Sequence, residues 1–407
     1  MPLIKRQIAV VGGGLAGWSA AVGFAKAGFD TILLAPASTS DRRSTALIGP
    51  SVDFLAGLGL AEGLREAGQP LVVMRLIDDT GRLLRAPTVE FHASEIDLDA
   101  FGQNVMNADL LRMLNEIGET LSDRLTVVEE GLVSIATDAD GVTIETATHE
   151  IRAGLAVGAD GRNSPVRTHA GIGVRKWSYP QSAIVLNFAH DRDHDSISTE
   201  FHTRTGPFTQ VPLPGRRSSL VWVEEPKVAD LLADVSLSRL SRMVEDRMHS
   251  ILGAVEVEEG VQCFPLSGAA AERMTAERIA LVGEAAHVFP PIGAQGLNLG
   301  LRDAADLIEV AGRHRDDPGC PAMLRDYEAK RRVDVVSRTA AVDLLNRSLL
   351  TEFLPVQAIR SLGLGLLARG SMLRRFVMKE GVTPGSSLRR SPRRTPPDDA
   401  PLDPLVP

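Results

Sequence analysis

The first apolar runs of the chain predict a strand, a helix and a second strand. Gln7–Val11 is a short apolar run, Trp18–Ala27 is rich in Ala and is followed by Gly28, and Phe29–Leu34 is apolar again. Short apolar runs bounded by glycine indicate buried strands, and the longer Ala-rich run between them favours a helix. The order indicates a βαβ unit.

The middle of the chain has a different pattern, in which apolar and polar residues alternate. Such alternation predicts antiparallel strands at Ala183–Phe188, Ser196–His202 and Ser219–Val223. Leu237–Leu252 has the spacing of an amphipathic helix, and Val261–Pro265 is another short strand. These elements predict a second, β-rich layer, to which short strands within residues 71–98 contribute.

Two further segments each predict a strand, a tight turn and the start of a helix. The first is Leu155–Arg167, where the strand ends in Asp160-Gly161. The second is Arg278–Asp303, where a buried strand leads into a loop dense in Gly and Pro that Glu284 opens. Glycines let a backbone approach a flat ligand closely, and helix N-termini offer unpaired N–H groups to negative charge.

Composition and charge narrow the class of protein. The chain has 407 residues, of which 44% are hydrophobic and 24% charged, enough for two domains with a sizeable core. Its net charge of −8 argues against a nucleic-acid partner. Cys263 and Cys320 lack metal-ligand spacing, so no metal site is expected, and they suggest a reducing, cytoplasmic setting. We expect no secretory signal, because the first apolar run is already the first strand, and no membrane-spanning segment, because no run of about 20 uncharged apolar residues occurs.

The C-terminal part is apolar and basic. Leu345–Lys379 includes Arg360, Arg369, Arg374, Arg375 and Lys379. Such a segment can lie on a membrane surface as an amphipathic helix, and it is equally compatible with a helix packed on the protein's own body. From Val382 onward, the richness in Pro, Arg and Asp predicts a disordered tail.

The glycine run after the first strand matches the dinucleotide-binding fingerprint. Gly12 suits the turn, Gly14 lets a pyrophosphate approach, and Gly17 lets helix and strand pack. The motif alone is weak evidence, but its βαβ context favours a dinucleotide site over a structural turn. The acid that normally follows the second strand is missing, because Leu33-Leu34-Ala35-Pro36 stands there. Ser38 and Thr39, and less favourably Asp41, are the nearest groups for a ribose.

Together the three motifs resemble the group A FAD-dependent aromatic hydroxylases, the p-hydroxybenzoate hydroxylase-like family. That family carries an N-terminal G-x-G-x-x-G, a central Asp-Gly and a late Gly-Asp motif in this order. A strand that ends in Asp-Gly is by itself more often a plain turn, whereas three ordered motifs are specific. The resemblance extends from about Ile8 to Arg375. Glu284 stands where the family has Asp, which keeps the charge and reaches one methylene further.

The resemblance implies a set of flavin-binding residues. Arg43 looks like the arginine of the family's helix start beside the flavin, and Gln103 looks like the family's cofactor-contacting Gln; otherwise they would be a surface ion pair and a capping side chain. The complete cofactor-binding set is Gly12, Gly14, Leu15, Ala16, Gly17, Arg43, Gln103, Asp160, Gly283, Glu284, Gly293, Ala294, Gly296, Leu297 and Asn298. The residues expected to face the reacting ring are Pro291, Gly293, Gln295 and Gly296.

Within the family, the chain is most similar to the ubiquinone-biosynthesis hydroxylases, through Gly296–Asp303 and Tyr327–Asp334. The expected fold is α/β, with a Rossmann-like FAD-binding domain of the glutathione-reductase type, a mainly antiparallel β-sheet substrate domain and C-terminal helices. The expected domains are 1–70, 99–180 and 266–345 for FAD, 71–98 and 181–265 for substrate, 346–381 for C-terminal helices, and 382–407 for the tail.

The resemblance also implies a mechanism. FAD would be reduced by NADPH, NADH or a protein redox partner and would react with O₂ to a C4a-hydroperoxide that hydroxylates an electron-rich ring. Backbone N–H groups of Gly293–Gly296 would stabilise negative charge on the flavin. No general base is assigned. Tyr179 and Tyr327 are the two tyrosines, which disfavours a Tyr relay, and structural roles are favoured for His92, His202 and His287.

The expected function is therefore an FAD-dependent monooxygenase that hydroxylates a polyprenylated phenol in ubiquinone biosynthesis. A lipid-like substrate suits a cytoplasmic enzyme held peripherally at the inner face of the membrane, or in a quinone-biosynthesis complex. The alternatives are a hydroxylase of a small soluble phenol or a secondary metabolite, an FAD-dependent reductase or oxidase of the same fold, and a non-enzymatic flavin-binding scaffold.

Overall fold

The N-terminal βαβ unit forms the centre of a mainly parallel sheet. We analysed a computed structural model, which describes residues 2–37, 41–81, 86–290, 295–350 and 371–382. The sheet has eight strands: β1 (Leu3–Val11), β2 (Thr31–Leu34), β8 (Leu125–Val128), β9 (Ser134–Asp138), β10 (Gly141–Glu145), β11 (Glu150–Gly158), β18 (Thr275–Ala276) and β19 (Ile279–Leu281). β1 pairs in parallel with β2 and β11, and β11 pairs in parallel with β19. The three sequence motifs therefore follow the carboxyl ends of three neighbouring parallel strands, β1, β11 and β19, and lie on the same side of the sheet.

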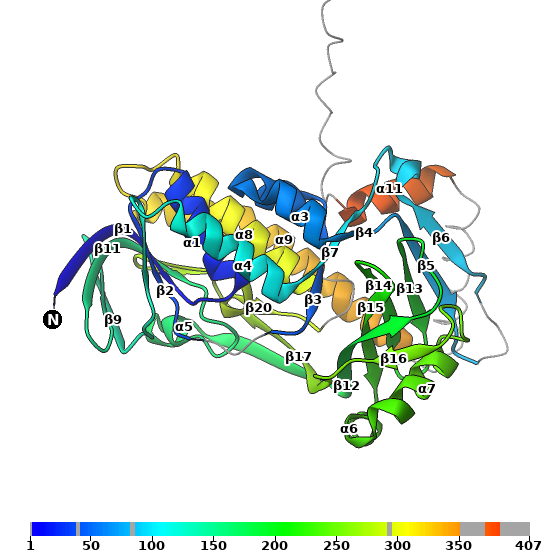
Figure 1. The fold of residues 1–407 in the computed structure, drawn as a ribbon. Helices are drawn as coiled ribbons and strands as arrows, with labels where there is room; N and C mark the ends of the chain where they lie inside the picture. The colour runs from blue at the N-terminus through cyan, green and yellow to red at the C-terminus, as the bar shows by residue number, and fades with distance from the viewer. Residues whose placement is uncertain (1, 38–40, 82–85, 291–294, 351–370, 383–407) are drawn as a thin grey trace, which may run out of the picture.

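Helices pack against this sheet and enclose a large apolar core. The ten helices of the described residues are α1 (Leu15–Lys26), α2 (Pro50–Leu55), α3 (Ala61–Ala67), α4 (Asn107–Glu119), α5 (Pro165–His169), α6 (Pro226–Asp234), α7 (Leu237–Arg247), α8 (Gln295–Ala311), α9 (Pro321–Leu350) and α11 (Ser371–Val382). Figure 1 shows α1, α4, α8 and α9 side by side. α1 is buried over most of its length because its small Ala and Gly residues allow close contact on several sides.

The second sheet is mainly antiparallel and has nine strands: β5 (Val73–Asp78), β6 (Val89–His92), β12 (Val174–His190), β13 (Ile197–His202), β14 (Pro207–Leu213), β15 (Arg217–Glu224), β16 (Val255–Val257), β17 (Gln262–Ala271) and β20 (His287–Val288). One of its faces forms a separate core with α6 and α7, around Phe188, Phe201 and Trp222. The other face is free to form the wall of a site. The predicted α/β fold with an antiparallel second layer is confirmed.

Long strands and a small sheet join the two halves. β12 and β17 run from the region below the first sheet into the second, as Figure 1 shows. The boundaries expected at 180/181 and 265/266 fall inside these two continuous strands. A three-stranded sheet of β3 (Ser44–Ile48), β7 (Gly102–Met106) and β4 (Gln69–Pro70) lies between the halves. Three short helical turns complete the described elements, at Ala56–Leu60, Ala93–Ile96 and Gly283–Ala285.

One local expectation is wrong. The Arg43 segment is not the start of a helix, because Ser44–Ile48 forms strand β3, which pairs antiparallel with β7. Gly49 then takes a φ of 50°, and Pro50 begins the helix that the sequence placed earlier. Pro favours the first position of a helix, and the turn before it suits glycine.

The C-terminal helix packs on the protein's own body. Arg374 of α11 pairs with Glu95 at 2.6 Å and lies over the ring of Phe91, and Met378 is buried against Phe101. This position agrees with the second of the two interpretations of the segment. Residues 351–370 and the expected tail at 383–407 lie outside the described residues.

Candidate functional site

A cavity of about 1010 Å³ opens at the end of β1. Gly12, Gly13, Gly14 and Leu15 line one side of it, and Asp160 of the Asp-Gly motif lines another. Gly12 has a φ of 123°, and a Cβ there would approach the carbonyl oxygen of Ala159 to 2.3 Å. The two motifs thus touch through a contact that only glycine permits.

The N-terminus of α1 faces this cavity, and no side chain in the described part of the chain caps it. Its N-cap is Gly14, and its first turn contains no acidic residue. A Cβ at Gly14 would meet nothing within 4 Å, whereas one at Gly17 would meet the Gly12 oxygen at 1.9 Å. Gly14 therefore leaves open space for a ligand, and Gly17 allows close packing of helix and loop. The exposed N–H groups suit a pyrophosphate.

Asp160 contributes a carboxylate to the same cavity. Its Oδ2 accepts a hydrogen bond from the Val166 backbone N–H at 2.9 Å. Its Oδ1 is buried and has no hydrogen-bond partner of normal geometry among the described residues. Burial raises the pKa of the Asp160 carboxyl. Such an oxygen suits a ligand that donates hydroxyl hydrogen bonds, such as a ribose or a ribityl chain.

Arg43 lies where this cavity meets a second one. Its guanidinium binds both carboxylate oxygens of Asp41, at 2.8 and 2.7 Å, and Asp41 also accepts a hydrogen bond from Asn107. The hydrogen bond with Asp41, followed by the charges of Asp41 and Glu284, raises the Arg43 pKa against the effect of burial. Arg43, Asp41 and Asn107 line both cavities.

The second cavity, of about 700 Å³, lies between the flavin-motif loops and the free face of the nine-stranded sheet. Gly283, Glu284, Gly296 and Leu297 line it on the loop side. Its other walls are mostly apolar, and their apolar residues include Leu71, Met74, Phe91, Phe101, Val185, Val211, Leu220, Val221, Phe264, Leu266, Val377 and Met378. The cavity can therefore hold a planar group beside the loops and an apolar molecule against the sheet.

Glu284 is half exposed in this arrangement. The exposed fraction of its side chain is 50%, and its carboxylate lies 3.7 Å from Arg162. The preceding Gly283 has a φ of 61° and lies against Ala16 of α1. The late motif is thus held against the first motif, and its carboxylate is left available at the cavity wall.

Three of the described residues in the predicted cofactor-binding set line neither cavity: Gly17, Gln103 and Asn298. Gln103 lies on the opposite face of β7 from Asn104, and only Asn104 of the two lines the second cavity. Successive side chains of a strand alternate between faces, which explains the difference. Asn298 instead holds β3, donating to the Ala46 oxygen at 2.7 Å and accepting from the Ile48 N–H at 2.9 Å.

Part of the predicted set cannot be placed. Pro291, Gly293 and Ala294 lie outside the described residues, as do the ribose candidates Ser38 and Thr39. Gln295 begins α8, and a Cβ on the next residue, Gly296, would meet nothing within 4 Å. The roles assigned to this segment stay predictions.

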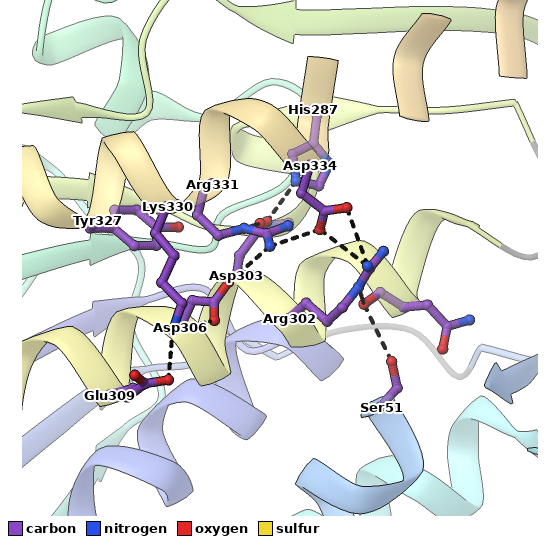
Figure 2. Close-up of polar contacts among 12 residues, drawn as sticks. Ser51, His287, Arg302, Asp303, Asp306, Glu309, Tyr327, Lys330, Arg331 and Asp334 are labelled. Carbon is purple, nitrogen blue, oxygen red and sulfur yellow. Dashed lines mark hydrogen bonds and ion pairs between the residues drawn. The ribbon is translucent and has the colours of Figure 1, made fainter. Parts of the chain in front are cut away.

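Behind the Glu284 loop lies a buried ionic network, which Figure 2 shows between α8 and α9. Asp303, fully buried, accepts hydrogen bonds from the Gly283 N–H at 2.9 Å, the His287 Nε2 at 2.6 Å and the Arg331 Nε at 2.7 Å. Arg331 also binds Asp306 and Asp334. Burial raises the pKa of Asp303, but the charges of His287 and Arg331 outweigh it and lower the pKa. The network fixes the backbone of the loop.

The residues present fit FAD. The uncapped end of α1 suits its pyrophosphate, the Asp160 oxygen suits a hydroxyl donor, and the open space at Gly296 leaves room for a flat ring. A family model described as the FAD binding domain matches residues 5–341. The chain belongs to this family, the FAD-dependent monooxygenases of the aromatic-hydroxylase type.

Similar proteins agree with this assignment. The chain is 34% identical to the ubiquinone hydroxylase UbiL of Rhodospirillum rubrum, covering 92% of this chain and 89% of that protein. It is 31% identical to the 3-demethoxyubiquinol 3-hydroxylase of Escherichia coli, covering 92% and 97%. The fold matches the crystal structure of p-nitrophenol 4-monooxygenase PnpA from Pseudomonas putida, with a TM-score of 0.78, 20% identity, and 93% and 98% coverage. The predicted family, fold class, enzyme class and cofactor FAD are confirmed.

Sequence reasoning missed several polar residues of the cavities. Asn107 begins α4 and lines both cavities, and Asn104 lines the second. Glu200 lines the second cavity from β13. A signal existed for Glu200, because a charged residue stood at an alternating position of a strand assigned to the substrate layer. Asn104 and Asn107 carried no such signal.

Proposed function

We propose that this enzyme hydroxylates the aromatic ring of a prenylated phenol or quinone precursor in ubiquinone biosynthesis. The observation that carries the proposal is the second cavity, where the loops of the FAD site and an apolar wall of the sheet enclose one space. Two relatives more than 30% identical over nine tenths of this chain bear names from ubiquinone hydroxylation. An apolar cavity suits a substrate with a prenyl chain.

The residues of this chain bind and orient the reactants. FAD, when bound, supplies the oxygen-activating chemistry, with NADPH or NADH as the electron source and O₂ as the co-substrate. The backbone N–H groups at the start of α8, around Gly296, would stabilise negative charge on the flavin ring. The apolar wall would exclude water from the ring during the reaction.

The enzyme would meet its substrate at a membrane surface or in a complex of quinone-forming enzymes. None of the helices in the described part of the chain has the length and hydropathy needed to cross a bilayer. Arg375 and Lys379 are exposed on α11, the same helix that lines the cavity with Val377 and Met378. This arrangement supports peripheral contact with anionic lipids, near the place where an apolar substrate would enter.

The decisive experiment is a turnover assay on the FAD-loaded enzyme. We expect ortho-geranylphenol to stimulate NADPH or NADH oxidation and to be recovered with one added ring hydroxyl. A small soluble phenol without the prenyl chain should be turned over with a much higher KM, because it buries less apolar area. Oxidation of the reductant without any oxygenated product would contradict the proposal.

A further inference from the structure

Glu200 lies on the nine-stranded sheet and lines the second cavity. It belongs to β13, whose alternate residues Thr199 and Phe201 are buried on the opposite face. Ser198 and Glu200 line the cavity, together with Thr209 from β14. Among the described residues that line this cavity, Glu200 is the only charged one that comes from the nine-stranded sheet. The other charged groups, Asp41, Arg43, Arg162 and Glu284, belong to the FAD side.

His202 holds the Glu200 carboxylate in place. Its Nε2 lies 2.8 Å from Glu200 Oε1, and the exposed fractions of the two side chains are 7% and 18%. Burial raises the pKa of Glu200, but the hydrogen bond and charge of His202, with a hydrogen bond from Thr209, outweigh it and hold the pKa below its usual value. The group is therefore a carboxylate in a mostly apolar wall. Burying such a charge is costly unless it is paired and hydrogen-bonded.

The second oxygen of the Glu200 carboxylate, Oε2, can accept a further hydrogen bond. Oε1 is directed to His202, whereas Oε2 accepts, among the described residues, only a long hydrogen bond of 3.3 Å from Thr209. A carboxylate oxygen can accept about two hydrogen bonds. The cavity side of Glu200 thus offers a charged acceptor next to apolar surface. A phenol matches it, since its ring is apolar and its hydroxyl is a donor.

We propose that Glu200 accepts a hydrogen bond from the ring hydroxyl of the aromatic substrate, while His202 orients the carboxylate from behind. The inference rests on the proposed function and names the group that recognises the substrate's hydroxyl. The hydrogen bond fixes how the ring is turned toward the FAD side of the cavity. A charged acceptor also increases the electron density of the ring, which favours attack on it.

The test compares ortho-geranylphenol with its methyl ether, which lacks the hydroxyl hydrogen. Binding is measured from the change in flavin absorbance, and turnover from the hydroxylated product. We expect the wild-type enzyme to prefer the phenol at least about tenfold in Kd, because a hydrogen bond to a charged group is lost with the ether. In Glu200→Gln the preference should fall several-fold, since a neutral amide is a weaker acceptor.

Glu90→Gln is the matched control. Glu90 lies on β6 of the same sheet, pairs with Arg75 at 2.7 Å and does not line the cavity. It should retain the wild-type preference. A carboxylate with only a structural role would leave the ratio of phenol to ether unchanged in Glu200→Gln, and that result would overturn the inference.

The wild-type comparison keeps the inference falsifiable if Glu200→Gln does not fold. Equal binding of phenol and ether, with ring hydroxylation still observed, would overturn the role of Glu200 and leave the proposed function intact. A wild-type enzyme that forms no ring-hydroxylated product would overturn the proposed function, and the inference with it. His202→Gln provides a second variant, which should reduce the preference less than Glu200→Gln because the carboxylate remains.

Discussion

At the scale of single residues, a carboxylate and its immediate neighbours determine what the site can bind. Glu284 stands where the family has Asp, and it remains half exposed at the wall of the second cavity. Asp303, in contrast, is fully buried behind it and serves the loop rather than the ligand. We therefore expect the two acids of this motif region to have different roles, because Asp303 is fully buried and hydrogen-bonded, whereas Glu284 is half exposed.

We expect Glu284→Gln to weaken FAD binding about tenfold. A hydrogen bond from a cofactor hydroxyl to a charged acceptor is worth roughly 1.5–3 kcal/mol, and the neutral amide retains part of it. Glu284→Asp keeps the charge and should have the smaller effect. The measurement is the Kd of FAD for the apoprotein, by fluorescence quenching. An unchanged Kd in Glu284→Gln would remove Glu284 from the binding set.

Asp303→Asn should be strongly destabilising, by about 3–5 kcal/mol, because it leaves His287 and Arg331 buried without their common partner. Asp326→Asn is the matched control. Asp326 also pairs with a histidine, His314 at 3.3 Å, but on the surface, where such pairs contribute about 0–1 kcal/mol. Thermal unfolding of the two variants measures how much stability each substitution removes. Equal melting temperatures would show that the network carries little stability.

The contribution of Asp303 should depend on pH in a defined direction. Its pKa in the folded protein is lowered from 3.8, so the folded state favours the carboxylate more than the unfolded state does. The stability that it contributes is then complete above roughly pH 5 and is lost as the pH falls through the lower folded pKa. The difference in unfolding free energy between wild type and Asp303→Asn should therefore shrink below about pH 4. A constant difference would contradict this.

At the scale of elements, two glycines of the turn between β1 and α1 have different roles, one in ligand binding and the other in packing. Gly14→Ala has room for its Cβ, so it should retain the wild-type melting temperature while binding FAD at least several-fold more weakly. Gly17→Ala places a Cβ 1.9 Å from the Gly12 oxygen and should lower both stability and FAD affinity. Thermal unfolding of the apoproteins and FAD titration distinguish the two. Equal loss of stability in both variants would be evidence against this division.

At the scale of the whole molecule, the C-terminal helix closes a cavity built by segments far apart in the chain. Arg374 of α11 forms an ion pair with Glu95 and a cation–π contact with the ring of Phe91. In this position of α11, Val377 and Met378 line the cavity. We expect Arg374→Ala to raise several-fold the fraction of reductant oxidised without hydroxylated product, because water reaches the site. Arg375→Ala, at an exposed neighbouring position, should behave like wild type. Product yield per NADPH consumed is the measurement, and equal yields would contradict a closing role.

Much of the FAD site could be predicted because it depends on local patterns. The turn at Gly12, the Asp-Gly turn at Asp160 and the loop at Glu284 each follow a strand, and parallel strands bring their ends to one edge. Gln103 and Asn104 show where such prediction stops. A motif match names a residue, but the pairing of β7 with β3 decides which of two neighbours faces the cavity.

The sequence by itself determined the βαβ unit, the order of the three motifs, the antiparallel middle and hence the family, because these depend on periodicity and on glycines at required turns. Only the tertiary structure placed α11 over the cavity, joined Asp303 to His287 and Arg331, and directed Glu200 into an apolar wall. Those contacts join residues distant in the chain, or depend on which face of a strand is buried. Such relations arise from packing, which no local pattern records.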